Sequence, residues 1–201
     1  MTRIDRIVTS GVFSLDGEDF EVDNNIWLIG DDREVVVIDA AHDHRPIAAA
    51  VRGRKVKAIV CTHAHNDHIN AAAELAEVTN APIWLHPDDS PLWEVVYPER
   101  RVDDALRHGR VIGVGGAELR VIHTPGHSPG GVSLSLDADR ILFSGDTLFK
   151  GGPGATGRSF SDRDQLIDSI TNKLLVMPET TVVHTGHGES TTIESEKPNI
   201  R

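Results

Sequence analysis

Several features that define other protein classes are missing from this sequence. It holds one cysteine, Cys61, which excludes an internal disulfide framework and a CxxC zinc or redox motif. No apolar run approaches the roughly 20 residues of a transmembrane helix. The first residues mix charges and lack the apolar stretch of a secretory signal. We therefore expect a cytoplasmic protein, with Cys61 as a small buried apolar residue rather than a nucleophile.

Positive charge is also scarce. The chain has 20 Lys and Arg residues against 31 Asp and Glu residues, which gives a formal net charge of −11. This balance argues against nucleic acid as the main ligand, because phosphate contacts need clustered Lys and Arg. It also disfavours an anionic membrane surface. We expect a small-molecule substrate, and the sequence leaves the oligomeric state open.

The length of 201 residues suggests one domain, since a domain commonly holds about 150 residues. A chain of this size can bury a core without disulfides. It shows no internal repeat and no Pro- or Ser-rich linker. We therefore predict a single domain over residues 1–201, with a frayed polar tail over residues 190–201.

Short apolar and β-branched runs separated by Gly, Asp and Asn predict strands. The expected strands cover residues 4–9, 25–29, 34–39, 56–62, 82–85, 118–123, 132–136, 140–144 and 180–184. Apolar spacing predicts helices over residues 68–79, 87–96 and 163–175, and a helical turn over residues 103–108. This order is neither strict βαβ alternation nor all-β. It favours two mixed sheets packed face to face, with helices outside.

Histidine is abundant, with 11 residues, and its positions are informative. Residues 63–68 read HAHNDH and follow a predicted buried strand. His63 and His65 are two residues apart, so they point the same way in an extended chain. Asp67 and His68 follow where the chain turns into a predicted helix. Imidazole and carboxylate groups are ligands that zinc, iron and manganese accept, and four in one segment suit two neighbouring metals.

Three later segments place a His or Asp beside glycine just after a predicted strand. They read TPGH at 124–127, SGDT at 144–147 and TGHG at 185–188. A strand end can direct a side chain into a cleft, and glycine permits a tight turn there. His127, Asp146 and His187 are therefore candidates to complete the metal shells.

The ordered set HAHNDH, TPGH, SGDTLF and TGHG resembles the metallo-β-lactamase superfamily. GDTLF and the aspartate within it look most like the glyoxalase II-like hydrolases of that superfamily. The resemblance spans most of the chain, from about Val36 to His187. It implies an α/β (α+β) fold, a four-layer αββα sandwich of two mixed β-sheets flanked by helices. It also implies two divalent metal ions, with zinc expected first and iron or manganese as alternatives.

The resemblance further implies a role for each matching position. The implied ligands are His63, His65 and His127 for the first metal, Asp67, His68 and His187 for the second, and Asp146 as the bridge. Two cations about 3.5–4 Å apart can hold a hydroxide that attacks a carbonyl. Asp67 and Asp146 are the expected catalytic residues, because one can orient this nucleophile and the other bridges the metals.

The implied activity is hydrolysis of a small acyl thioester. Glyoxalase II proteins carry a C-terminal helical extension that contacts glutathione, whereas this sequence ends shortly after His187, so we expect another low-molecular-weight thiol. The composition, rich in Ala, Arg, Val and Asp, suggests a high-GC bacterium and makes mycothiol esters one candidate. The alternative is a mononuclear iron persulfide dioxygenase, which uses a 2-His-1-carboxylate face. A lactonase or other ester hydrolase, and a non-enzymatic metal-binding module, stay open.

Four further residues are candidates near the site. Asp39 ends a predicted buried strand, and it either orients a metal-bound histidine or forms a strand-end turn. Lys150 and Arg158 flank a Gly-rich loop, where they either meet an anionic substrate or are simply solvated. His184, like His123, is expected to pack against the core more readily than to bind metal.

Overall fold

Two six-stranded sheets form the centre of the molecule. The computed structural model describes residues 2–200, and Met1 and Arg201 lie outside the described residues. The strands of the first sheet lie side by side in chain order, the first three antiparallel and the others added in parallel. They are β1 (Arg3–Leu15), β2 (Glu18–Gly30), β3 (Glu34–Ile38), β4 (Lys55–Val60), β5 (Ile83–Leu85) and β6 (Asp104–Ala105).

The second sheet has the order β14-β13-β10-β9-β8-β7, and among its pairs β10 and β13 are parallel. Its strands are β7 (Val111–Val114), β8 (Ala117–His123), β9 (Val132–Leu136), β10 (Ile141–Gly145), β13 (Val182–Thr185) and β14 (Thr191–Thr192). A small separate hairpin pairs β11 (Leu148–Phe149) with β12 (Gly152–Pro153).

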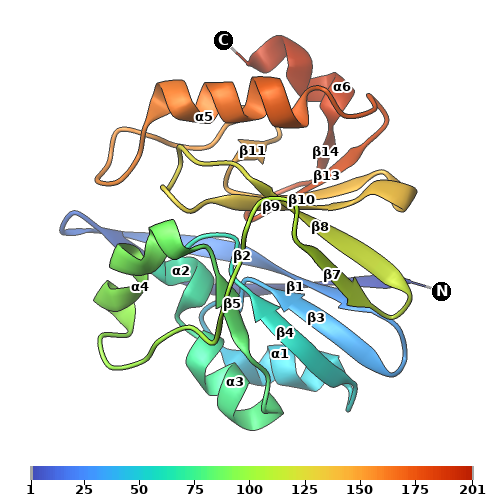
Figure 1. Ribbon diagram of the computed structural model, residues 1–201. Helices are drawn as coiled ribbons and strands as arrows, with labels where there is room; N and C mark the ends of the chain where they lie inside the picture. Colours follow the sequence, from blue (N-terminus) through green and yellow to red (C-terminus); the bar gives the residue numbers. More distant parts are fainter. Residues whose placement is uncertain (1, 201) are drawn as a thin grey trace.

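Helices cover the outer faces of both sheets (Figure 1). The first sheet carries α1 (His44–Val51), α2 (Asn66–Ile69), α3 (Ala72–Thr79) and α4 (Ser90–Val96). The second sheet carries α5 (Arg163–Ser169), its π-helical continuation (Ile170–Leu174) and α6 (Ile193–Glu196). Short 3₁₀ turns occur at Pro87–Asp89, Asp137–Asp139 and Lys197–Asn199. The result is the expected four-layer αββα sandwich of two mixed sheets.

Three clusters of buried apolar side chains lie between the four layers of helices and sheets. Strand β3 contributes to two of these clusters. Val35 and Val37 face α1 and α3, whereas Val36 and Ile38 face the second sheet. All four side chains are buried. A strand that is covered on both faces needs an apolar residue at every position, so its sequence reads as a continuous apolar run rather than an alternating one.

Three predicted local structures are wrong or incomplete. The helix expected over residues 68–79 is divided into α2 and α3, because the Ala71 amide donates to the Ala40 carbonyl and Asn70 accepts from the His42 amide. The turn expected over residues 103–108 instead contains the edge strand β6, which pairs with β5. Helix α1 was not predicted. The first two differences reflect contacts between distant segments.

The prediction of a frayed tail over residues 190–201 is also wrong for the part that the structure describes. Residues 191–199 form β14, α6 and a 3₁₀ turn. Ile193 is fully buried against the second sheet. The Glu196 carboxylate accepts hydrogen bonds from the Gly151 amide and the Thr191 hydroxyl. One buried isoleucine and one buried carboxylate therefore fix a segment whose composition is polar.

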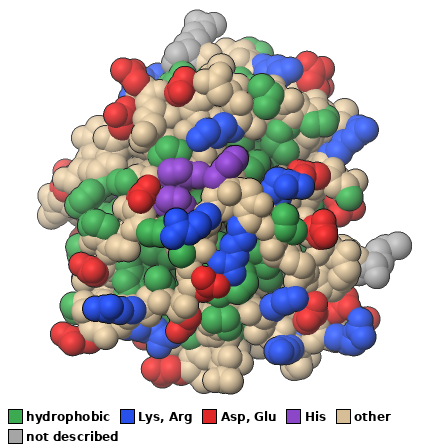
Figure 2. All heavy atoms as spheres, viewed as in Figure 1, with side chains coloured by type: hydrophobic (Ala, Val, Ile, Leu, Met, Phe, Trp, Pro, Cys, Tyr) green, Lys and Arg blue, Asp and Glu red, His purple; other side chains and the backbone are tan. Residues whose placement is uncertain are grey.

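Among the described residues, no helix combines the length and the apolar character needed to cross a bilayer. On the face drawn in Figure 2, acidic and basic side chains are interspersed, and histidines gather near the middle.

Candidate metal centre

The HAHNDH segment leaves β4 and enters α2, and it carries four of the candidate ligands. His65 occupies the position before the first turn of α2, so Asp67 and His68 lie within that turn. His63 and the three residues just named are all buried. The loop therefore directs several donors inward at the end of the first sheet.

The first donor group brings three imidazoles together. Nδ1 of His65 lies 3.0 Å from Nε2 of His63 and 3.0 Å from Nε2 of His127. His127 follows β8 of the second sheet, so both sheets contribute. The rings meet edge to face, with interplanar angles of 86° for His63–His65 and 89° for His65–His127. Three in-plane nitrogens thus converge on one point.

The second donor group adds a carboxylate. Nε2 of His68 lies 3.1 Å from Nε2 of His187, which follows β13. Oδ2 of Asp67 lies 3.3 Å from Nε2 of His187 and 3.5 Å from Nε2 of His68. This group combines two imidazoles with one carboxylate.

Asp146, just after β10, lies between the two groups. Its Oδ2 is 3.7 Å from Nε2 of His127 and 3.4 Å from Nε2 of His187, while its Oδ1 is 3.4 Å from Nε2 of His68. Oδ1 is buried and has no hydrogen-bond partner. A buried carboxylate oxygen without a donor needs another source of positive charge. Asp146 therefore has the position of a bridging ligand.

The outer nitrogens of two histidines fix which nitrogen faces the centre. Nδ1 of His127 lies 2.8 Å from the Ala155 carbonyl, and Nδ1 of His187 lies 2.8 Å from the Asp23 carbonyl. A carbonyl oxygen can only accept, so each Nδ1 must carry the proton and donate. Nε2 is then the nitrogen of each ring that faces the centre and can bind a metal there.

Asp39 fixes two more histidines in the same way. It is buried, and its carboxylate accepts from Nδ1 of His68 at 3.0 Å and from the Thr62 hydroxyl at 2.7 Å. Because that hydroxyl donates to Asp39, its oxygen accepts from Nδ1 of His63 at 3.1 Å. In both rings Nε2 is therefore the nitrogen that faces inward. Of the two interpretations left open for Asp39, the structure shows the histidine-orienting contact.

The electrostatic environments of the two groups differ. Burial lowers the pKa of His63 well below its usual value and lowers the pKa of His65 to about 3, so these two rings are neutral. Burial acts in the same direction on His187, but the carboxylates of Asp146 and Asp67 outweigh it and raise its pKa to about 10. The second group thus attracts positive charge, which a cation can supply in place of protons.

The donor set fits two divalent cations. It supplies five inward imidazole nitrogens and two carboxylates, which zinc, iron and manganese all accept. Gly186 explains why glycine precedes His187: a Cβ there would overlap the Asp146 carboxylate and the His68 ring. The glycine permits close packing of the donors, in addition to any turn.

Two residues that support the donors were not predicted. Asn24 is fully buried and donates from Nδ2 to Oδ2 of Asp67 at 3.1 Å. Asp89 is also fully buried, and its carboxylate accepts from the Ala64 amide, the Ser128 hydroxyl and the Gly130 amide. Asp89 thereby joins the HAHNDH loop to the loop that carries His127. Neither residue belongs to a local motif that would have identified it.

The remaining candidates have partners of their own outside the donor groups. Lys150 forms an ion pair with Glu189, and Arg158 forms one with Glu18 at 2.7 Å. His184 stacks on Trp27, with ring centroids 4.2 Å apart, so it packs as expected. Cys61, by contrast, is fully buried, and burial raises the pKa of its thiol well above the usual value, which suits a packing residue.

A separate group of possible ligands, His86, Asp88 and His123, has a different geometry. The two imidazoles stack face to face, with centroids 4.0 Å apart and planes inclined by 10°. The lone pair of an imidazole nitrogen lies in the ring plane, so two stacked parallel rings cannot both direct one to a single ion. We therefore interpret this pair as packing.

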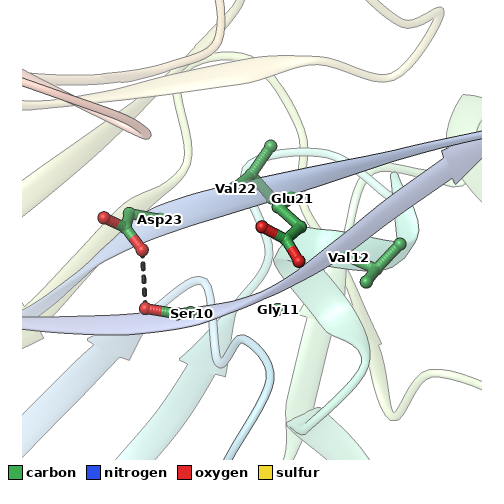
Figure 3. A pocket seen from close by; sticks show the side chains of 6 residues that line it. All are labelled: Ser10, Gly11, Val12, Glu21, Val22 and Asp23. Carbon is green, nitrogen blue, oxygen red and sulfur yellow. Dashed lines mark hydrogen bonds between the residues drawn. The ribbon is translucent and has the colours of Figure 1, made fainter.

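An open groove of about 600 Å³ runs along the β1–β2 hairpin (Figure 3). Its lining residues are Ser10, Gly11, Val12, Glu21, Val22 and Asp23. The Ser10 hydroxyl donates to the Asp23 carboxylate at 2.6 Å. Since the Asp23 carbonyl also accepts from His187, the groove adjoins the second donor group. The lining includes two carboxylates and no Lys or Arg.

A sandwich of this type with two adjoining His-rich donor groups defines a class of metal-dependent enzyme. The chain belongs to the metallo-beta-lactamase superfamily, whose family model matches residues 20–187. It is 32% identical to "Probable metallo-hydrolase YqgX" of Bacillus subtilis, over 87% of this chain and 89% of the relative. It is 30% identical to "Hydroxyacylglutathione hydrolase GloC" of Haemophilus influenzae, over 86% of this chain and 89% of the relative.

A solved structure gives the same result for the fold. The crystal structure of TTHA1623 in a di-iron-bound form matches with a TM-score of 0.79 and 33% identity, covering 89% of this chain and 94% of that chain. The donor groups are typical of a dinuclear centre of this superfamily. Family and site together indicate a metallo-hydrolase.

Proposed function

We propose that this protein is a dinuclear, zinc-dependent hydrolase of small acyl thioesters. The observation that carries the proposal is the position of Asp146, which lies within 3.7 Å of donors from both groups. A mononuclear oxygenase needs two histidines and one carboxylate, whereas this chain brings a complete second donor group to the same place. The likeness to a relative named as a hydroxyacylglutathione hydrolase supports a thioester substrate.

We assign the seven donors as the sequence resemblance implied, with His63, His65 and His127 in one shell, Asp67, His68 and His187 in the other, and Asp146 shared. Divalent cations held there would supply Lewis acidity and would activate a water. The chain contributes orientation. Asp39 and the backbone carbonyls of Ala155 and Asp23 hold the outer N–H groups, so the inner nitrogens are the ones that a cation would meet in place of protons.

Asp67 acts as an acceptor in this scheme. Burial raises its pKa, but His68, His187 and Asn24 outweigh burial and lower the pKa to about 2. The carboxylate is therefore ionised at neutral pH and cannot donate a proton. It can orient the attacking water by accepting a hydrogen bond, while Asn24 keeps its Oδ2 in place.

We also propose that the thiol part of the substrate carries little negative charge. Lys150 and Arg158, for which contact with an anionic substrate was one of two interpretations, are each paired with a glutamate. The groove beside the second donor group presents Glu21 and Asp23. Both observations favour a neutral or weakly charged thiol such as mycothiol over a dianionic one.

The test combines metal content with a substrate panel. Protein purified without chelators or a nickel column is expected to hold about two zinc ions per chain by elemental mass spectrometry. Acyl thioesters of N-acetylcysteamine, mycothiol and glutathione are then compared with lactones, with released thiol measured by a chromogenic reagent. About one iron per chain, with oxygen uptake on a persulfide, would overturn the proposal in favour of a dioxygenase.

A further inference from the structure

The end of the β1–β2 hairpin reaches over the first donor group. The Phe13 ring lies 5.3 Å from the His65 ring, inclined by 60°. On its other side Phe13 stacks with Phe20, with centroids 6.2 Å apart. Nε2 of His65 is buried without a hydrogen-bond partner. The hairpin therefore covers the outer side of this histidine and excludes water from it.

Polar contacts hold the hairpin in this position. The Arg158 guanidinium pairs with Glu18 and lies 4.8 Å over the Phe20 ring. The Ser159 amide donates to the Asp16 carboxylate at 2.9 Å. These contacts tie the end of the hairpin to the loop over residues 154–161.

A second set of contacts fixes the hairpin from the side of the metal loop. Nδ2 of Asn66 donates to the Val12 carbonyl, and Oδ1 of Asn66 accepts from the Ser14 amide, both at 2.8 Å. The hairpin is thus anchored on two sides of Phe13. It forms a fixed wall rather than a free arm.

The wall encloses a small cavity of about 50 Å³ beside His65 and His127. Phe13, Leu15 and Ala155 give it apolar surface, and the charge of Arg158 at its edge is paired with Glu18. A cavity needs about 10–15 Å³ of such space to hold one water-sized group, so this one has room for only a few groups of methylene size. A thiol carrier such as mycothiol or glutathione is far too large to enter.

We propose that this cavity is the acyl subsite and that it selects short, unbranched apolar acyl chains. The inference rests on the proposed thioesterase function. It adds that Phe13, Leu15 and Ala155 determine chain-length specificity, while the thiol part stays outside, toward the groove of the hairpin. Each methylene that enters is expected to raise kcat/KM about fourfold.

The experiment uses the metal-loaded enzyme and straight-chain thioesters of N-acetylcysteamine from acetyl to octanoyl. We expect kcat/KM to rise from acetyl to butanoyl and to fall at hexanoyl and octanoyl. Phe13→Ala enlarges the cavity, so its ratio of hexanoyl to butanoyl rates is expected to rise at least tenfold, by about two methylene contributions. Ala155→Leu fills the cavity and should make acetyl the best substrate. Val8→Ala, on the same strand at an exposed position, is the control.

A flat chain-length profile, or an unchanged ratio in both variants, would refute the subsite. A binding readout separates this outcome from failure of the thioesterase proposal. Saturation-transfer NMR with butanoate should show its terminal methyl in contact with the wild-type protein and with Val8→Ala, and a loss of that contact in Ala155→Leu. If butanoate binds in this way but no thioester is cleaved, the subsite stands and the proposed reaction is wrong.

Discussion

Two regions of the molecule gather histidines, and they differ in ring orientation. At the metal centre the rings of His65 and His127 meet at 89°, and the outer N–H of His127 is held by a backbone carbonyl. His86 and His123 instead stack with their planes 10° apart. In each group of three possible ligands, the ligand atoms lie within 4.8 Å of one another. Short distances between donors are therefore not enough to form a metal site. The hydrogen-bond acceptor behind each ring determines where the lone pair of the other nitrogen points.

The largest expected effect comes from removing the residue shared by both donor groups. Asp146→Asn is isosteric but loses the charge that faces His68, His127 and His187. We expect loss of bound metal and a fall in turnover of about 1,000-fold, since a metal contributes several kcal/mol to the transition state. Elemental analysis and the thioesterase assay check this, with the exposed Asp139→Asn as control. Full activity with bound metal would disprove the bridging role.

A smaller effect is expected from substitution of Asp39, the carboxylate that orients the rings of His68 and His63. In Asp39→Asn the side chain can no longer accept on both atoms, so the tautomers of His68 and His63 are less well fixed. We expect metal affinity to fall about 10- to 100-fold, as for other partners of metal-bound histidines. Competition with a fluorescent chelator measures it. Unchanged affinity would show that the ring orientations do not depend on this carboxylate.

The packing role of His86 in the stacked pair should appear in the pH dependence of thermal stability. Burial and the neighbouring His123 lower the pKa of His86 to about 4, below the value near 6.5 of the unfolded chain. A lowered histidine pKa stabilises the fold above about pH 6.5, and this contribution is lost as the pH falls toward 4. We expect the Tm difference between wild type and His86→Asn, which keeps a capping acceptor for the Asp88 amide, to shrink by a few degrees between pH 7 and 5. A Tm difference that stays constant between pH 7 and 5 would contradict the interpretation of His86 as a buried, neutral packing residue.

The smallest effect on metal content is expected from a substitution in the same stacked pair, His86 and His123. His123→Ala removes a ring that stacks but does not converge with other donors. Metal content should equal that of the wild type, while the free energy of unfolding falls by about 1 kcal/mol through the lost ring contact. Elemental analysis and urea unfolding measure both. A loss of one metal ion per chain would mean that the stacked pair rearranges to bind metal.

The sequence was sufficient to select the seven residues that the structure brings together, because each lies in a short motif at a strand end. The contacts that orient them were harder to predict. Asn24 reaches Asp67 across 43 residues, and Asp89 reaches Ala64 and Gly130 across 25 and 41 residues. A single polar residue with such distant partners leaves no spacing to detect.

Long-range contacts also limited the prediction of the fold from the sequence. Strands such as β3 are covered on both faces, so their apolar runs were evident. The break between α2 and α3 depends on Asn70 and Ala71 bonding to residues 42 and 40. The ordered end of the chain depends on Ile193 reaching the second sheet. Local propensity carries no information about such contacts, which form only when the layers meet.

The distribution of donors over the two sheets has a consequence for folding. Four donors follow β4 of the first sheet, while His127, Asp146 and His187 follow three strands of the second. A cation held by both sets would act as a cross-link that closes the long chain segment from His63 to His187, in a protein whose lone cysteine forbids a disulfide. Chelation should then loosen the docking of the two sheets, and added metal should slow their separation. The ions would then stabilise the packing of the two sheets against each other, in addition to taking part in catalysis.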